Sequence, residues 1–128
     1  MGLDMYAFRV AKNFALGDFE IAGLEHGVRH EEIMYWRKHH DLHGWMERLY
    51  RAKGGDKPSF NCIPVRLTIE DLNALEADIL ADKLPVTQGF FFGVNPPDED
   101  SKLQDMEFIG MAKIAISEGD EVYYDSWW

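Results

Sequence analysis

The sequence contains one cysteine, no long run of apolar residues and comparatively few basic side chains. With Cys62 alone the chain cannot form an internal disulfide, which is typical of proteins in a reducing compartment. No segment approaches the roughly 20 consecutive apolar residues that span a bilayer. The segment from Met1 to Val10 lacks the basic start and apolar stretch of a signal peptide. We therefore expect a soluble protein of the cytoplasm.

Basic residues are scarce relative to acidic ones, with 13 Lys and Arg against 23 Asp and Glu and a net charge of −10. Nucleic acids and anionic membranes are bound through basic clusters, so this balance argues against direct binding to either. More than half of the basic residues lie between positions 29 and 57. They are Arg29, Arg37, Lys38, Arg48, Arg51, Lys53 and Lys57.

Hydrophobic residues make up 46% of the 128 residues, and aromatic residues make up 13%. A chain of this length and composition can bury a core without disulfides or metals. It contains no repeat and no linker, so we expect residues 1–128 to form a single domain. The aromatic surplus also predicts that some rings line a surface or a groove.

Periodicity and capping residues predict strands and helices in alternation. The expected strands are residues 3–10, 60–67, 89–93 and 121–128. The expected helices are residues 30–38, 41–53 and 68–82 and a last helix that follows Asp98 and ends at Gly119. This order predicts an α+β fold with a small antiparallel or mixed sheet of about four strands and about four helices, mainly on one face.

Several residues set the expected helix boundaries and faces. Asp41 is the expected N-cap of the helix to Lys53, and Thr68 with Asp71 forms a weaker version of the capping box. Gly54 is expected to end the helix that Asp41 begins. The last helix is expected to turn its apolar side chains toward the core. These side chains are Leu103, Met106, Ile109, Met111 and Ile114.

All five histidines lie between positions 26 and 43. His26 and His30 are four residues apart, as are His39 and His43, and this spacing can share a metal on a helix. Gly27 weakens the first helical placement, and His39 precedes the expected N-cap. No cysteine pair, HExxH motif or carboxylate ladder completes a ligand set. We therefore expect no metal and no other cofactor.

A thiol nucleophile is the second chemistry to weigh, with Cys62 as the nucleophile and His43 as its base. Cys62 lies in an apolar strand sequence, where a lone cysteine is more often a small buried side chain. No strand–turn–helix elbow or oxyanion motif accompanies it. We expect no catalysis by this thiol, and the catalytic residues of any reaction are unknown.

The strongest candidate for a binding segment is an aromatic and basic stretch in the expected first helix. There, Trp36 packs inward, and Arg37 or Lys38 meets an anion or an acidic partner. Tyr35 or Trp36 offers a stacking face. The alternative is structural, with Trp36 and Trp45 joining two helices while the basic residues pair with the protein's own acids.

The C-terminal segment is also rich in aromatic residues. In a strand, Tyr124 points to one side of the sheet, whereas Tyr123 and Trp127 point to the other. One side packs on the core, and the other presents rings of the kind that anchor protein interfaces. The alternative is that helices cover both sides. Tyr124 and Trp127 are therefore further candidates for binding.

Four motifs occur in a distinctive order along the chain. They are Gly2-Leu3-Asp4-Met5-Tyr6; Tyr35-Trp36-Arg37-Lys38 with His43 and Trp45; Leu84-Pro85 with Gly89-Phe90-Phe91-Phe92-Gly93; and Tyr123-Tyr124-Asp125-Ser126-Trp127. Together they resemble a family of small, uncharacterised proteins of bacteriophages and prophages. Asp125 replaces a serine of that family, and the segment before Tyr35 is shorter. The resemblance implies a phage-type origin, a shared fold and the host cytoplasm as location, but no chemistry.

Two functions remain open. The first is a non-enzymatic, acidic interaction protein that binds and modulates a host protein. The second is an enzyme or sensor for a phosphorylated or anionic small molecule. A deep pocket where the candidate side chains converge favours the second function, and a flat aromatic patch favours the first, which we expect. The side chains expected around such a pocket are Tyr35, Arg37, Lys38, His43 and Tyr124.

Overall fold

The computed structural model describes residues 2–22, 30–85 and 99–128. Its main sheet has four strands in the order β4-β1-β6-β5, and each neighbouring pair is antiparallel. The two central strands, β1 and β6, pair along their whole length. The bounds are Asp4–Ala11 for β1, Glu31–Arg37 for β4, Val65–Leu67 for β5 and Asp120–Trp127 for β6.

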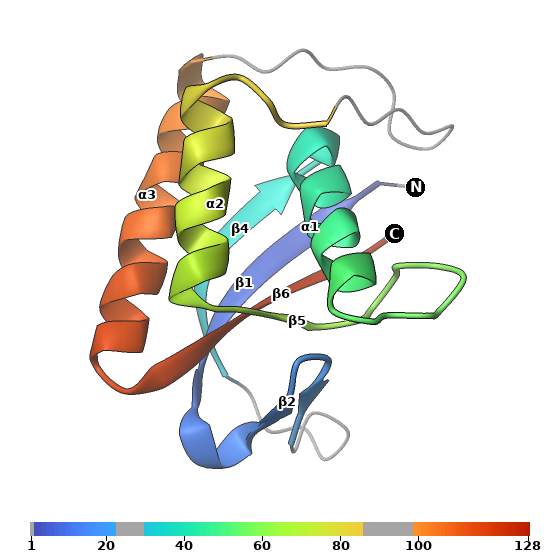
Figure 1. The fold of residues 1–128 in the computed structure, drawn as a ribbon, viewed down its shortest axis with the longest axis vertical. Coiled ribbons are helices and arrows are strands. Elements are labelled where there is room, and N and C mark those ends of the chain that lie inside the picture. The colour runs from blue at the N-terminus through green and yellow to red at the C-terminus, as the bar shows by residue number, and fades with distance from the viewer. Residues whose placement is uncertain (1, 23–29, 86–98) are drawn as a thin grey trace.

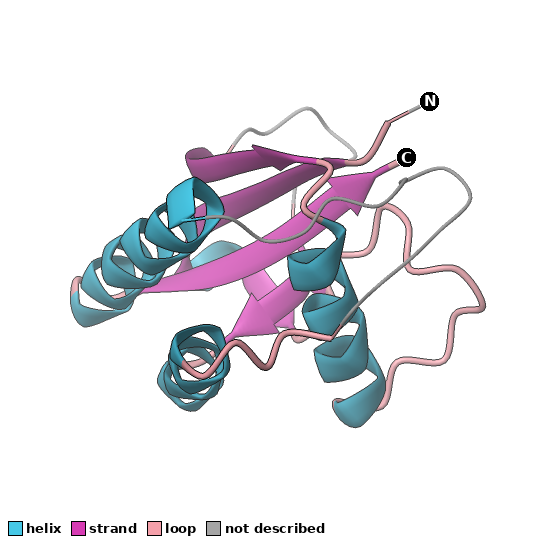
Figure 2. Ribbon diagram, turned by 90° about the horizontal axis from the view of Figure 1, so that it is seen from above, coloured by secondary structure: helices cyan, strands magenta, loops and turns pink. Residues whose placement is uncertain are grey.

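Three helices cover one face of this sheet (Figure 1, Figure 2). They are α1 (His40–Ala52), α2 (Ile69–Leu80) and α3 (Glu99–Ser117). The core lies between the sheet and the helices, where Met5 and Ala7 of β1 meet Phe108 of α3 in one buried cluster. This architecture confirms the expected α+β class. None of the described helices is long and apolar enough to cross a membrane.

A smaller sheet lies beside one end of the main sheet (Figure 1). It consists of β2 (Ala15–Gly17) and β3 (Glu20–Ile21), preceded by the 3₁₀ helix η1 (Lys12–Phe14). Ile21 packs with Val10 of β1 and Tyr123 of β6 in a second buried cluster. The small sheet therefore covers one end of the face that lies opposite the helices.

The segment 30–38 is a strand, so the expected helix there was wrong. β4 pairs with β1 from Arg37 opposite Asp4 to Glu31 opposite Arg9. At its end, Trp36 is buried while its two neighbours are exposed, which is the alternation of a strand. Pairing with β1 and burial of the Trp36 ring outweigh the local helical pattern. Lys38, with φ of 60°, then turns the chain toward α1.

Two further boundaries differ from expectation. The N-cap of α1 is His39, and the expected cap Asp41 lies in the first turn, where it is buried. The strand expected from Phe60 is limited to β5, because the residue before it, Pro64, has no N–H to donate to a ladder. Gly54, at φ of 100°, follows the end of α1 as expected.

The capping box of α2 is present as expected. The backbone N–H of Asp71 donates to the Thr68 hydroxyl over 3.2 Å, and the Thr68 N–H donates to the Asp71 carboxylate over 2.9 Å. Burial raises the pKa of Asp71, but hydrogen bonds and the charge of Lys53 outweigh it and leave the pKa below its usual value. Thr68 and Asp71 therefore cap the start of this helix, and Lys53 of the preceding segment forms an ion pair of 2.7 Å with Asp71.

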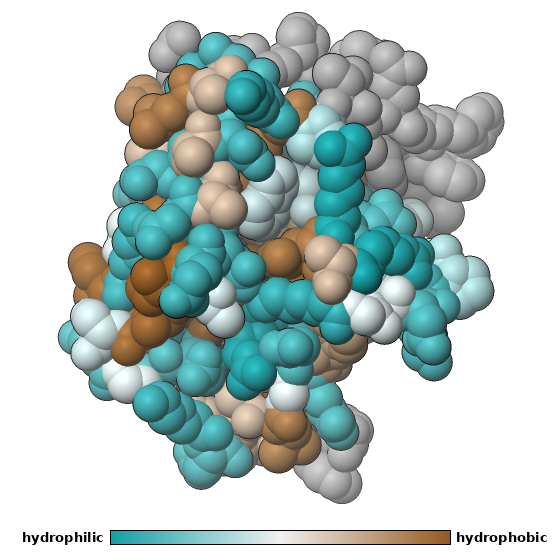
Figure 3. Space-filling view, in the orientation of Figure 1, coloured by the Kyte–Doolittle hydropathy of each residue, from teal (hydrophilic) through white to brown (hydrophobic). Residues whose placement is uncertain are grey.

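The orientation of α3 corrects its expected core face. Ile109 is buried as expected, but Leu103 and Ile114 are 66% and 58% exposed. At 100° per residue, these two lie on the side of the helix opposite Ala112, which is fully buried. Hydrophobic side chains consequently reach the surface over α2 and α3 (Figure 3). The strand expected at 89–93 lies outside the described residues.

Candidate functional site

The face of the sheet opposite the helices carries a group of aromatic and charged side chains. Met5 and Ala7 point into the core, so the residues that alternate with them on β1 point away from it. In the described part of the chain, all three helices lie on the other side (Figure 2). We call this group the open face: Asp4, Tyr6 and Phe8 of β1; Glu32, Tyr35 and Arg37 of β4; and Asp125 and Trp127 of β6.

The aromatic rings of the open face adjoin one another across β1 and β4. Tyr6 lies opposite Tyr35 in the strand register, and their ring centroids are 5.3 Å apart. Phe8 stacks beside Tyr6 with a centroid distance of 6.0 Å. Tyr35 is 40% exposed, and Trp127 of β6 is 65% exposed. The face therefore leaves large rings in contact with water, as protein interfaces do before they are covered.

Three carboxylates lie around Tyr6. Asp125 is its register partner on β6, Asp4 precedes it on β1, and Glu32 is the register partner of Phe8. The Tyr35 hydroxyl donates a hydrogen bond of 2.6 Å to Asp4. Burial raises the pKa of the Tyr6 hydroxyl, and the charges of all three carboxylates raise it further. The centre of the open face is therefore electrically negative.

Asp125 is the most enclosed of these carboxylates. Burial raises its pKa to about 6, although its Oδ1 accepts a hydrogen bond of 2.8 Å from the Ser126 N–H. Arg37, which lies opposite Asp4 at the end of β4, is the one basic residue of the open face. At neutral pH three carboxylates thus share this surface with a single guanidinium group.

Trp36 points to the helix side and does not belong to this surface. It is 2% exposed, and its indole N–H donates to Asp105 of α3 over 3.1 Å. Its ring meets Phe108 edge-on, with centroids 4.9 Å apart. Neighbouring residues of a strand point to opposite faces, so Trp36 cannot share a stacking surface with Tyr35. Trp36 is thus buried as expected, and Tyr35 is the ring of this pair that remains available for binding.

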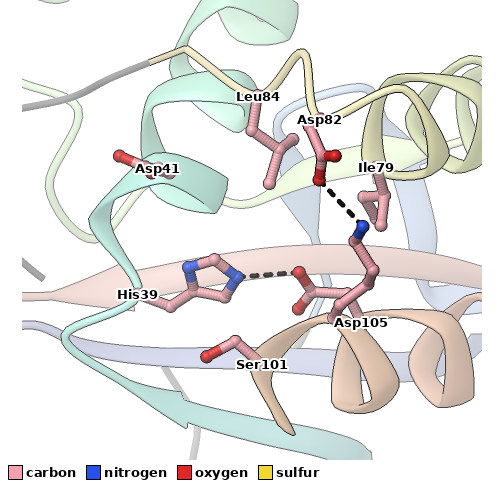
Figure 4. A pocket seen from close by; sticks show the side chains of 8 residues that line it. His39, Asp41, Ile79, Asp82, Leu84, Ser101 and Asp105 are labelled. Atoms are coloured by element: carbon pink, nitrogen blue, oxygen red, sulfur yellow. Dashed lines mark hydrogen bonds and ion pairs between the residues drawn. The ribbon is translucent and has the colours of Figure 1, made fainter. Parts of the chain in front are cut away.

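A cavity of about 110 Å³ lies between the start of α1, the end of α2 and α3 (Figure 4). Inside it, the His39 Nε2 is 2.8 Å from an Asp105 carboxylate oxygen, and the Lys102 ammonium is 2.8 Å from Asp82. Four of the titratable side chains that line it are therefore paired with one another. Of the residues expected from the sequence to surround a ligand, none lines this cavity.

His43 and Tyr124 form a hydrogen-bonded pair in the core. His43 is 2% exposed, and its Nδ1 lies 2.6 Å from the Tyr124 hydroxyl. Phe60 stacks on the imidazole at 5.2 Å, and Trp128 meets it edge-on at 4.8 Å. Burial lowers the pKa of His43 to about 4 and raises that of Tyr124 well above its usual value. Both groups are therefore neutral at pH 7.

The five residues expected around a small-molecule pocket are divided between the two faces of the sheet. Tyr35 and Arg37 lie on the open face, and Lys38 is exposed just beyond the end of β4. His43 and Tyr124 are buried on the helix side. The structure does not bring these side chains together, whereas it does place Tyr35 and Trp127 on the same face.

The histidines do not converge either. His39 is paired with Asp105, and His43 is bonded to Tyr124. His30 contacts the carbonyl oxygen of Ala22 at 3.3 Å, whereas His26 lies outside the described residues. Within residues 2–22, 30–85 and 99–128, no group of three or more His, Cys, Asp or Glu side chains could hold a metal.

Cys62 is exposed rather than buried, which corrects the expectation from its apolar neighbours. Partial burial of the sulfur and the nearby charge of Asp125 raise the pKa of the thiol. A thiol with a raised pKa is a poor nucleophile at neutral pH. Its hydrogen-bond partner is Asn61, at 3.5 Å, while the imidazole of His43 is engaged by Tyr124.

No known protein family, curated protein or solved structure matches the chain. Sequence reasoning missed Glu32 and Asp125 as members of the candidate site, and it also missed Asp4, Tyr6 and Phe8 of β1. The signal was their alternation with Met5 and Ala7, which is typical of a strand with one packed face. That alternation does not reveal whether a second layer covers the other face.

Proposed function

We propose that this is a phage-type accessory protein that works by binding a host protein through its open face, without catalysis of its own. The observation that carries the proposal is the group of exposed and partly exposed rings on the sheet face opposite the helices. Tyr35 and Trp127 are 40% and 65% exposed there, beside Tyr6. A folded protein loses free energy by leaving such rings in water, and a partner that covers them recovers it.

The composition of the open face supports this proposal. The cores of protein interfaces are enriched in Tyr, Trp, Phe and Arg, and all four residue types occur on it. Tyrosine and tryptophan also bury a large area with little loss of side-chain entropy. In the cavity between the helices, His39 is paired with Asp105 and Lys102 with Asp82, which favours a surface function over a function of that cavity.

The resemblance of four motifs to phage proteins supports a partner from the host cell. A net charge of −10 suits a protein that remains soluble and monomeric until it meets a complementary surface. We place this encounter in the host cytoplasm, where a lone reduced cysteine is stable.

Affinity capture from a bacterial host lysate tests the proposal. The variant with both Tyr35→Ala and Trp127→Ala removes the exposed rings, and the matched control with Leu80→Ala and Ile114→Ala removes exposed side chains of the helices. We expect the wild type and the control to recover the same protein and the first variant to lose it. Truncation of a central aromatic anchor costs about 2 kcal/mol or more of binding free energy.

The recovered protein should then be purified and titrated against each variant. Equal affinity of the open-face variant and the wild type would contradict the proposal. Loss of binding in the control would instead place the interface on α2 and α3. Thermal melts of all variants show whether each one is folded, so that a loss of binding can be distinguished from unfolding.

A further inference from the structure

The charges of the open face distinguish one kind of partner from others. The Tyr6 ring lies at its centre, with the Tyr35 ring at 5.3 Å and the Phe8 ring at 6.0 Å. Asp125 is its register partner on β6, and Glu32, the register partner of Phe8, lies two register pairs further along β4. The combination is a set of electron-rich ring faces bordered by carboxylates, which attracts cations in two independent ways.

We propose that the open face binds a basic segment of a partner protein, with a lysine or arginine side chain seated over the Tyr6 ring. The proposal rests on the proposed function and adds the chemistry of the partner. A cation within about 6 Å of a tyrosine ring gains a favourable interaction with its face. The Asp125 and Glu32 carboxylates lie on either side of this position and supply the opposite charge.

Two further contacts shape the site. Asp4 is held in place by the hydrogen bond from the Tyr35 hydroxyl, so its carboxylate is oriented before the partner arrives. Trp127, the register partner of Asp4 on β6, is 65% exposed and can cover the aliphatic part of a bound lysine or arginine. Arg37, opposite Asp4 on the other side, repels a cation and therefore weakens the site.

Other occupants fit this surface less well. Bases of a single-stranded nucleic acid stack on aromatic sheet faces, but its phosphates would meet three carboxylates on a chain with a net charge of −10. An anionic membrane meets the same repulsion. A second copy of this chain would bring the same carboxylates face to face.

Peptide titrations monitored by amide NMR shifts test the proposal with defined probes. The first probe is an N-acetylated, C-amidated (Arg-Gly)₄ peptide, and the matched probes are (Glu-Gly)₄ and an oligothymidine. We expect binding of the arginine peptide only, with shifts concentrated in β1, β4 and β6. Tyr6→Leu should weaken it by about two- to fivefold, the loss of one cation–π contact at an exposed site.

A pair of charge reversals provides the sharpest comparison. Arg37→Glu and Lys83→Glu change the net charge equally, but only Arg37 belongs to the open face, whereas Lys83 is exposed after the end of α2. We expect the Arg37→Glu variant to bind the arginine peptide about threefold more tightly than the Lys83→Glu variant does. The exposed Glu32→Gln should weaken it, and this variant keeps the test valid if Tyr6→Leu does not fold.

The proposal is overturned if the arginine peptide does not bind, if (Glu-Gly)₄ or oligothymidine binds as tightly, or if Arg37→Glu and Lys83→Glu behave alike. The proposed function has a separate outcome. Suppose that a host protein no longer binds the Tyr35 and Trp127 variant, but the arginine peptide does not compete with it for the wild type. The open face would then remain the interface, and a basic segment would be excluded as its ligand.

Discussion

Acidification should destabilise this protein through His43. The ordinary pKa of a histidine is 6.5, and burial lowers that of His43 to about 4. Below pH 6.5 the unfolded chain takes up a proton at this imidazole that the folded chain does not accept. The contribution of the neutral His43 side chain to the free energy of unfolding is therefore fully present above pH 6.5. It is lost as the pH falls from 6.5 to 4. A difference of this size corresponds to about 3 kcal/mol.

The measurement compares urea unfolding of the wild type and of His43→Gln at pH 7 and at pH 4. Glutamine is polar and uncharged at both values, so its contribution does not change with pH. We expect the wild type to lose about 3 kcal/mol more than His43→Gln between the two conditions. His30→Gln is the matched control, since His30 lies outside the cluster of Phe60, Tyr124 and Trp128, and it should follow the wild type.

The reasoning would be refuted by parallel pH profiles for the wild type and His43→Gln. That result would mean that water or a counter-charge reaches the imidazole in the folded state. The His43 ring signals in an NMR titration give an independent reading, because they should not change until the pH approaches 4.

Three other predictions, with four substitutions, test the placement of side chains by urea unfolding. Burial raises the pKa of Asp125 to about 6, so its charge costs stability above that pH. Asp125→Asn should therefore stabilise the fold at pH 8 by on the order of 1–2 kcal/mol and have little effect at pH 3, below the usual pKa of an aspartate, where the carboxyl is neutral in both the folded and the unfolded chain; equal stability at pH 8 would show a solvated carboxylate. Phe108→Ala should cost about 3–5 kcal/mol and Leu103→Ala under about 1 kcal/mol, and the reverse order would mean that α3 is rotated. Trp45→Ala should lower the free energy of unfolding by about 3 kcal/mol, since the half-buried ring packs on the core and its N–H donates to Asp78 over 2.8 Å. Unchanged stability would place the ring in solvent.

Several elements could be predicted because the residues that determine them are neighbours in sequence. Thr68 and Asp71 satisfy each other's backbone N–H groups, so the start of α2 can be recognised from two residues three positions apart. Gly54 adopts a positive φ that ends α1, and Gly119 does the same after α3. The strands at both ends of the described chain were likewise correct, since their aromatic and β-branched residues favour extended structure.

The segment 30–38 could not be assigned in this way. Its glutamates and the spacing of its apolar residues suit a helix, but its neighbour β1 is more than twenty positions away in sequence. Only the pairing with β1, together with the contact between Trp36 and Asp105, selects the strand. The rotation of α3 is a similar case, since apolar residues occur on both sides of the helix and the close fit of Ala112 against the core decides which side is buried.

The sequence by itself determined the α+β class, the helix and strand ends with local caps, the lack of an internal disulfide and the net negative charge. These properties depend on composition or on residues a few positions apart. The tertiary structure alone decided that Tyr35 faces solvent while Trp36 is buried, and that His43 meets Tyr124 in the core. It also assembled the open face from three strands that lie far apart in the chain. Strand register places those side chains together, and the pairing partners of β1 lie more than twenty positions away along the chain, so its own sequence does not identify them.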